Sequence, residues 1–300
     1  MKHQSMFLAA FLGLSFASAA GCEESEPEGG PELIGTAEFA VETFNRLTMN
    51  HLNASSLGVT QLSTAALSSN GTTFAQSSLL STKSRRDVLT YLVRCALPDG
   101  MKISGSSGGK SYAFSGLIGL APEWLGAPLT TSGRHWVSAC MLAHVNGYNK
   151  QVPISLRGAH AALATSAAEV VAYPVEEMAF YGDIFGANNV MLACAGKGPQ
   201  AAYAADSDDD LGARRSCDED EGCLVNVPGP CQDIMLSGAD ACEGGGAGLP
   251  SSCHGSLKSS NLGWPAGDTA YPEVITVYMK TSDFEDYYDF DDFEPLSMDL

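Results

Sequence analysis

The feature that most constrains this 300-residue chain is the distribution of its nine cysteines. Cys22 ends a short amino-terminal apolar segment, and the other eight lie further along the chain. Because eight is an even number, all of these can pair in four disulfides in an oxidising compartment. They are Cys95, Cys140, Cys194, Cys217, Cys223, Cys231, Cys242 and Cys253. The count therefore predicts an exported, disulfide-stapled body and sets Cys22 apart.

Residues 1–21 have the pattern of a bacterial export signal. A lysine is followed by a short apolar run and then by small residues up to Cys22. The stretch 19–22, AAGC, resembles a lipobox, although Ala19 stands where bacterial lipoproteins usually carry leucine. We predict that Cys22 is lipidated and holds the chain on the outer membrane. The alternative is cleavage after Ala19, which leaves Cys22 as a thiol in a secreted protein.

Acidic residues gather in three segments of the chain. The formal net charge is −19, and residues 23–32, 206–221 and 283–299 hold five, eight and eight of the 35 acids. The remainder is nearly neutral and has no basic patch for phosphates, so we expect no nucleic-acid partner. The pattern predicts an acidic tether at 22–35 and an acidic disordered tail at 281–300.

Leucines recur at five-residue intervals in the segment 36–80. They are Leu47, Leu52, Leu57, Leu62 and Leu67. Five residues turn a helix by about 500° and change sides in a strand, so this period fits neither element. A β-solenoid with five residues per side places every such leucine inside, and the pattern resembles a degenerate pentapeptide repeat. The alternative is a chance spacing in a linker rich in Ser, Thr and Leu.

The body, residues 81–280, begins with a helical pattern. A helix is predicted from Lys83 to the residues before Pro98, and Ser84 with Asp87 resembles a capping box. Cys95 lies near the end of this predicted helix.

A second helix is predicted after residue 130. Thr131 or Ser132 can supply its N-cap and Gly147 can end it, which places Cys140 in the middle. Since both cysteines lie in helices, a bridge between Cys95 and Cys140 is the simplest pairing.

Strand patterns alternate irregularly with these helices. The segments 110–120, 152–156, 188–195 and 272–280 contain β-branched, aromatic or alternating apolar residues. Because no regular βαβ repeat is present, we predict an α+β fold in which two cysteine-bearing helices pack on a mainly antiparallel sheet.

Residues 197–265 form a cysteine-rich, loop-rich insertion in the predicted body. Fifteen pairings are open to the six cysteines from Cys194 to Cys253, so their connectivity stays undetermined. Asp206, Asp208 and Asp210 follow the first ligand positions of a calcium loop, but the glycine and closing glutamate of that motif are absent. We expect a solvated acidic loop at 206–221, with a looser calcium site as the alternative.

Six segments stand out together, in this order: YLVRCALPDG (91–100), GLAPEWLG (119–126), RHWVSACMLAHVNGY (134–148), VPISLRG (152–158), EEMAFYGDIFG (176–186) and VMLACAGKG (190–198). They resemble a family of uncharacterised, cysteine-rich predicted lipoproteins and secreted proteins of myxobacteria. The resemblance covers roughly residues 45–280. It implies a bacterial envelope location and carries no catalytic residue.

Candidates for chemistry are few. Residues 105–109 match the G-x-S-x-G motif, but a Ser/Gly hairpin connection is the better interpretation because the flanking strand and helix are missing. Glu123, which precedes Trp124, and the adjacent Glu176 and Glu177 are carboxylates that can form an acid–base site with His144. The alternative is that these residues are structural, as is His135 beside Trp136.

We therefore predict an extracytoplasmic, lipid-anchored protein with a non-enzymatic binding or envelope-structural role. The alternative is an extracytoplasmic hydrolase that acts on glycans through a carboxylate pair, and calcium-dependent adhesion is a third hypothesis. No cofactor and no resident metal are expected, since the chain has no Cys-x-x-Cys pair. Apart from the membrane, the partner is a protein or glycan that the sequence leaves unidentified.

Overall fold

The structure is a computed structural model. Its described residues belong to one compact unit within Gly35–Leu300. None of the helices in this part is long and apolar enough to span a lipid bilayer. The structure describes residues 78–145, 152–186, 189–196 and 270–288, with short stretches at 42–45, 59, 62–68, 217–218, 222–223, 225–227, 231 and 257–258.

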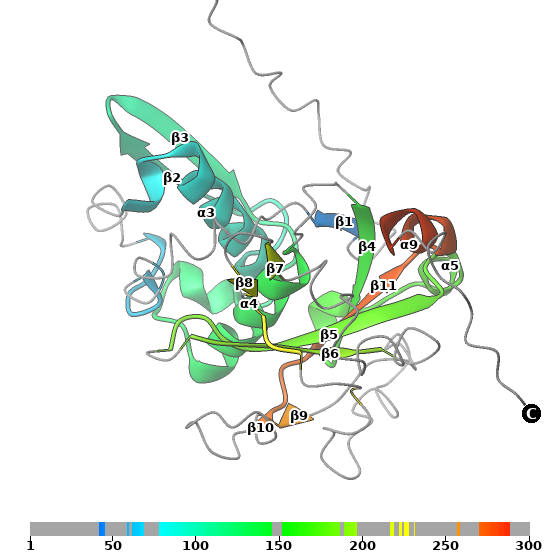
Figure 1. Cartoon of the computed structure of the whole chain (residues 1–300). Coiled ribbons are helices and arrows are strands. Elements are labelled where there is room, and N and C mark those ends of the chain that lie inside the picture. The colour runs from blue at the N-terminus through cyan, green and yellow to red at the C-terminus, as the bar shows by residue number, and fades with distance from the viewer. Residues whose placement is uncertain are drawn as a thin grey trace, which may run out of the picture. The chain divides into compact units, whose positions relative to one another are not determined.

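A five-stranded antiparallel sheet with the order β1-β4-β11-β5-β6 organises this unit (Figure 1). Its strands are β1 (Glu42–Asn45), β4 (Val152–Arg157), β5 (Val175–Asp183), β6 (Val190–Ala195) and β11 (Ile275–Met279). β11 is the last strand in sequence, yet it lies at the centre between β4 and β5. The predicted mixed fold with an antiparallel sheet is confirmed, although β1 and β5 were not among the predicted strands.

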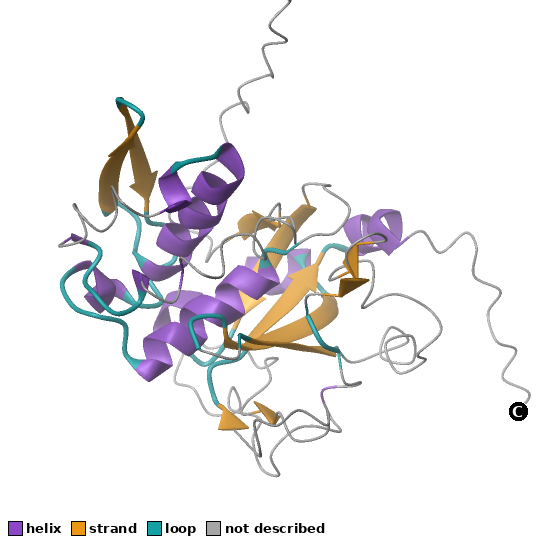
Figure 2. Cartoon of the chain, turned by 60° about the vertical axis from the view of Figure 1, so that its left-hand side comes forward, coloured by secondary structure: helices purple, strands orange, loops and turns teal. Residues whose placement is uncertain are grey.

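The described part contains four α-helices, drawn in purple in Figure 2. They are α3 (Lys83–Ala96), α4 (Thr131–Ala143), α5 (Ala167–Ala172) and α9 (Thr281–Tyr288), with 3-10 turns η2 (Ser78–Leu80), η3 (Pro122–Leu125) and η4 (Ala161–Leu163). α4 packs against β5 and β11 of the sheet, and α3 packs against α4. The two long predicted helices are confirmed, but the predicted N-caps are wrong, and α4 ends at Ala143, before the predicted Gly147. Thr82 and Thr130 are the N-caps, because their hydroxyls accept bonds from the amides of Arg85 and Gly133.

The two faces of the sheet differ in chemistry because side chains alternate along each strand. One face, called the apolar face below, packs against α4 and consists of Ile154, Leu156, Met178, Phe180, Ile275 and Val277. Over β4 and β11 the opposite face, called the polar face, carries Ser155, Arg157, Glu176, Thr276 and Tyr278. Towards β6 the same side of the sheet is apolar, with Ala179, Tyr181 and Cys194 in a second cluster. Both faces are covered, so the central strands are buried on each side.

Two disulfides cross-link the described part. The predicted bridge between α3 and α4 is confirmed, with the Cα atoms of Cys95 and Cys140 5.9 Å apart. A second bridge joins Cys194 of β6 to Cys231, 37 residues further on. This pair belongs to the set whose connectivity the sequence left open.

Smaller paired strands lie around the main sheet. The hairpin β2 (Lys102–Ser107) and β3 (Lys110–Ser115) turns at Gly108 and Gly109, whose φ angles of 59° and 77° favour glycine. The G-x-S-x-G segment is therefore part of a hairpin, as its flanks indicated. The other pairs are β7 (Cys217–Asp218) with β8 (Gly222–Cys223), and β9 (Leu257–Lys258) with β10 (Ala270–Tyr271).

The segment 36–80 contributes to the body. β1 forms an edge of the main sheet, and Leu62 and Leu67 are buried. The indole of Trp124 donates to the carbonyl of Ala65 at 3.2 Å, which ties this segment to η3. The first three leucines of the repeat lie outside the described residues, so the solenoid stays a prediction.

The prediction of disorder from residue 281 onward is wrong for its first eight residues, which form α9. Phe284 explains the difference, because it is buried in the main core and its amide donates to the carbonyl of Lys280. One docked aromatic side chain offsets the entropy of ordering a short acidic helix. Residues 289–300 lie outside the described part.

Candidate functional site

The residues proposed for glycan hydrolysis contact different partners. Glu123 lies in η3 beside the first turn of α4, where its carboxylate would be 3.0 Å from a Cβ placed on Gly133. Its charge also acts on His160: burial lowers the pKa of that imidazole, and Glu123 opposes the change. His160 in turn packs edge-on against Trp136, with ring centroids 5.1 Å apart.

Glu176 and Glu177 lie in β5, where the register shifts opposite Val277 and Tyr278. The hydroxyl of Tyr278 donates to Glu176 at 2.9 Å, which places Glu176 on the polar face. Glu177 is buried, and its carbonyl accepts a bond from the amide of Gly196. Glu176 thus has the hydroxyl of Tyr278 as a partner, while Glu177 is buried at the register shift.

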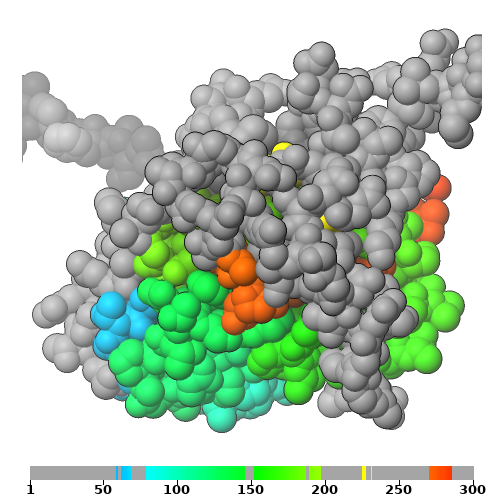
Figure 3. All heavy atoms as spheres, turned by 90° about the horizontal axis from the view of Figure 1, so that it is seen from below, coloured from blue at the N-terminus to red at the C-terminus, as the bar shows by residue number. Residues whose placement is uncertain are grey.

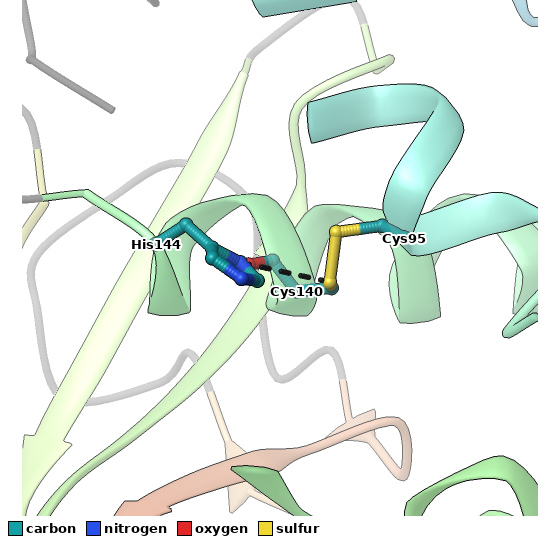
Figure 4. The surroundings of a disulfide bond; sticks show 3 residues. All are labelled: Cys95, Cys140 and His144. Atoms are coloured by element: carbon teal, nitrogen blue, oxygen red, sulfur yellow. Dashed lines mark hydrogen bonds between the residues drawn. A yellow bond between two sulfur atoms is a disulfide. The ribbon is translucent and has the colours of Figure 1, made fainter. Parts of the chain in front are cut away.

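His144, the proposed acid–base partner, lies beside the disulfide of Cys95 and Cys140 (Figure 4). Its Nδ1 is 2.7 Å from the carbonyl oxygen of Cys140, and since that oxygen can only accept, Nδ1 carries the proton. The imidazole also packs on the ring of Tyr91 at 5.0 Å. His144 is a satisfied interior histidine, as the structural alternative expected.

The same three residues form the one group of metal-ligating type found in the described part of the chain. Ligand atoms of Cys95, Cys140 and His144 lie within 4.8 Å of one another. Both sulfurs are bonded in the disulfide, and Nδ1 is engaged with a carbonyl. The group therefore serves as a cross-link with a packed imidazole, because a metal would need thiolates.

A cluster of charged side chains at the first turn of α4 was not predicted as a unit. His135 donates from Nδ1 to Glu273 at 3.1 Å, and its Nε2 lies 3.9 Å from Asp183. Arg134 reaches the same carboxylate at 3.4 Å. Tyr271 packs on the imidazole with ring centroids 5.0 Å apart. We call these five residues the α4 charge cluster.

The α4 charge cluster favours the ionised form of Glu273. Burial opposes the ionisation of Glu273, but hydrogen bonds from His135 and Ser132 outweigh it and lower the pKa of that carboxyl. Burial raises the pKa of the Tyr271 hydroxyl, and the charge of Asp183 raises it further. An aspartate and a glutamate thus flank one imidazole, and the bond from His135 helps to keep Glu273 ionised.

In chemical terms the α4 charge cluster holds elements together. An imidazole oriented by a carboxylate is also the arrangement of a general base, but here its second nitrogen faces Asp183, which Arg134 also binds. The contacts join α4 to the end of β5 and to the segment before β11. Figure 3 shows the orange surface that begins near residue 270 next to the green surface of the α4 region.

A second buried network lies on the polar face under α5. The guanidinium of Arg157 is 3.6 Å from the centre of the Tyr278 ring and donates to the carbonyl of Tyr173 at 2.7 Å. Ser155 accepts from Arg157 and donates to Glu169 of α5 at 2.7 Å. Burial lowers the pKa of Arg157, and the charges of its neighbours oppose that change.

Neither network follows from a local sequence pattern, and the reason is the same for both. Asp183, Glu273 and Glu169 are single acids in apolar or irregular segments, and their partners lie far away in sequence; His135 and Glu273 are 138 residues apart. A single acid inside an apolar run, as in Glu169 of AAEVVA, was the one available signal.

Of the other predicted site residues, Cys217 lies opposite Cys223 in the pairing of β7 with β8. Cys22, Cys242, Cys253 and the start of the acidic loop at 206–216 lie outside the described residues. The lipid site and the calcium hypothesis are therefore still predictions.

Comparison with protein-family models, curated proteins and solved structures found no match for this chain. The function is therefore argued from the chain's own residues.

Proposed function

We propose that this chain works outside the cytoplasm as a lipid-anchored protein whose body has a binding or envelope-structural role. The observation that carries the proposal is the pair of disulfides at Cys95–Cys140 and Cys194–Cys231. Structural disulfides of this kind form and persist in oxidising compartments. The amino-terminal export pattern supports the same compartment, and Cys22 supplies the anchor.

The fold uses its polar residues in a way that supports a non-enzymatic role. Glu123 acts on His160, Glu176 binds Tyr278, and His144 binds the carbonyl of Cys140. The glycan-hydrolase alternative needs two carboxyls about 5–10 Å apart on either side of a sugar. Glu123, Glu176 and His144 each have a different partner, which favours the non-enzymatic role over that alternative.

The experiment that tests the proposal is the intact mass of the protein purified from a bacterial envelope. We expect a diacylglycerol-modified Cys22, no thiol that reacts before reduction, and eight alkylated cysteines after it, in line with the count of nine. The matched control, Cys22→Ser, should lose the lipid and leave the membrane fraction while its other cysteines stay paired. A lipid-free wild-type chain with a reactive thiol would contradict anchoring and favour a secreted protein.

A further inference from the structure

Positive charge gathers in one stretch of this acidic chain. Residues 81–120 contain six lysines and arginines and two acids, whereas the remaining residues contain ten basic residues and 33 acids. The nearly neutral average of the body conceals this contrast. The stretch contains α3 and the β2–β3 hairpin, which pack together in the structure.

The position of α3 against the hairpin follows from contacts near both of its ends. The guanidinium of Arg86 lies 4.5 Å from the centre of the Tyr112 ring, and α3 packs along β3 (Figure 1). Further on, the amide of Leu117 donates to the carbonyl of Leu97, just beyond α3. From Arg86 to Leu97 the helix rises about 16 Å, and from Tyr112 to Leu117 an extended chain covers about the same length. Helix and strand therefore run side by side in the same direction.

α3 and β3 begin at the same level, and basic residues gather there. Lys83 lies about 4.5 Å before Arg86 along the helix, and Lys110 lies about 7 Å before Tyr112 along β3. Both lysines are exposed, and Lys110 is on the Tyr112 side of the strand because side chains two residues apart share a face. With Arg85, these residues form a surface that we call the basic end: Lys83, Arg85, Arg86 and Lys110.

The acids of the same stretch leave most of this charge uncompensated. Asp87 pairs with Lys83 at 3.2 Å, and because both side chains are exposed, water screens the pair. Asp99 follows the opposite end of α3. Among the residues of this stretch, the basic end therefore has a net positive charge, in a chain whose formal charge is −19.

Arg86 is held in place before any partner binds. Its Nη1 donates to the carbonyl of Leu80 at 3.1 Å, and its guanidinium lies over the ring of Tyr112. That bond uses one of five guanidinium donors, and the planar fork of the others matches the two oxygens of a carboxylate. Because the freedom of this side chain is already restricted, less entropy is lost on binding.

The surroundings of the basic end favour a carbohydrate partner. Ser106 and Ser111 are exposed near the tip of the hairpin, with their hydroxyl oxygens 3.2 Å apart. Hydroxyls both donate and accept, so they can bond to the hydroxyls of a sugar. The large exposed hydrophobic residues of the described part are Met101, Val170 and Val171, and none of these belongs to the basic end. The surface is therefore suited to polar contacts and not to insertion into a bilayer.

Two other polyanions fit this surface less well. An anionic membrane repels the acidic residues 23–32, which directly follow the predicted lipid site at Cys22. Double-stranded DNA carries one charge per about 1.7 Å, so it strongly repels the acids outside the basic end. A polysaccharide of uronic acids carries one carboxylate per sugar, separated from the next by hydroxyls. Its lower charge density suits a small basic surface on an acidic protein.

We propose that the basic end binds an acidic polysaccharide built from uronic acids. Arg86 binds one carboxylate through its planar fork, Lys110 binds a neighbouring carboxylate, and the serine hydroxyls contact the sugars between them. This assignment rests on the proposed binding role and names the chemical class of its ligand.

Isothermal titration calorimetry of the full chain with polygalacturonate oligosaccharides tests the proposal. At about 50 mM salt we expect saturable binding that weakens as the salt concentration rises. Arg86→Gln should raise the Kd about tenfold, because it removes charge-assisted bonds to a carboxylate. Lys110→Gln should raise the Kd about threefold. This second variant changes an exposed side chain, so it tests the site even where Arg86→Gln disturbs the packing on Tyr112.

Lys102→Gln is the matched control. It removes the same charge from the same hairpin, but at the far end, where Lys102 pairs with Ser115. The Kd of this variant should equal that of the wild type. An equal loss in Lys102→Gln and Lys110→Gln would show that the basic end is not the site.

Three further results would overturn the proposal. Absence of binding by the wild type would do so directly. Equally tight binding of methyl-esterified polygalacturonate would show that carboxylates are not recognised. Tighter binding of phosphatidylglycerol vesicles or duplex DNA, lost in Arg86→Gln, would assign the basic end to phosphates. The mass of Cys22 and the state of the disulfides are measured separately, so a lipidated chain that ignores polygalacturonate would contradict this inference alone.

Discussion

The two faces of the central sheet are covered in opposite ways. On the apolar face, Ile154 and Leu156 of β4 belong to the same apolar core as the buried residues of α4, which a disulfide links to α3. On the polar face, Ser155 and Arg157 of the same strand bond with α5 through directional hydrogen bonds. One strand thus supplies two kinds of interface from alternate residues.

The difference explains what each cover can do. Apolar burial is non-directional, so it stabilises α4 without fixing its rotation, and the disulfide and the α4 charge cluster supply the missing constraints. Hydrogen bonds to Glu169 fix the rotation of α5 while contributing less net stability. The polar face can therefore hold a helix with its apolar side outward, which an apolar interface would not permit.

Removal of the cross-link on the apolar face should produce the largest effect. Replacing Cys95 and Cys140 together by alanine removes a bridge between two residues that are 45 positions apart in sequence. We expect the free energy of unfolding to fall by about 4 kcal/mol, which corresponds to the entropy of closing such a loop. Urea denaturation measures this loss.

The matched variant for this measurement removes Cys194 and Cys231, which are 37 residues apart. Loop entropy alone predicts nearly the same loss for both pairs, about 4 kcal/mol. If removal of Cys95 and Cys140 lowered the free energy of unfolding less than the matched variant does, the apolar face would not depend on its cross-link.

Breaking the polar face should have the next largest effect. Glu169→Ala removes the one acid of α5 and leaves the buried Arg157 without that neighbouring charge. Removing one of two buried opposite charges typically lowers the free energy of unfolding by about 3 kcal/mol. Arg157→Met combined with Glu169→Leu should restore most of that stability, because well-packed apolar residues often replace buried opposite charges without loss.

Asp87→Asn is the control for this change, since the ion pair of Asp87 with Lys83 is exposed. An exposed pair contributes at most about 1 kcal/mol, so chemical denaturation should hardly distinguish this variant from the wild type. A similarly small loss for Glu169→Ala would show that the buried network does not hold α5.

The comparison also explains which elements the sequence could predict. α3 and α4 are long enough to show a helical period, and both cysteines of their bridge lie within that period. These are local patterns, so no tertiary information was needed. The bridge of Cys194 with Cys231 had no such local signal.

The remaining elements depend on distant contacts. β5 is buried on both faces, so its central residues form a continuous apolar run in place of an alternation, and a register shift displaces Glu177. α5 has only six residues, and its acid faces inward while its valines face outward. A search for amphipathic helices therefore misses it. The α4 charge cluster joins side chains from three segments, which no local pattern relates.

The smallest predicted effect tests whether the α4 charge cluster stabilises the apolar side through an ionised carboxylate. Hydrogen bonds from His135 and Ser132 lower the pKa of Glu273 in the folded protein. A carboxyl whose pKa is lowered by folding stabilises the folded state at pH values above its ordinary pKa. This contribution is lost as the pH falls through the pKa that the group has in the folded protein.

Glu273→Gln should therefore reduce the unfolding free energy at pH 7 by about 1–2 kcal/mol, the typical contribution of hydrogen bonds to a charged acceptor. The difference from the wild type should shrink below the ordinary glutamate pKa of about 4.3, because the wild-type carboxyl then also becomes neutral. Glu285→Gln, at an exposed position of α9, serves as the control and should show no such trend. A loss for Glu273→Gln that is the same at pH 7 and pH 3 would mean that Glu273 contributes by its shape and not by its charge. In that case α4 would be held by packing and the disulfide alone. The apolar face would then depend on no charge at all, while the polar face depends on the charges of Arg157 and Glu169.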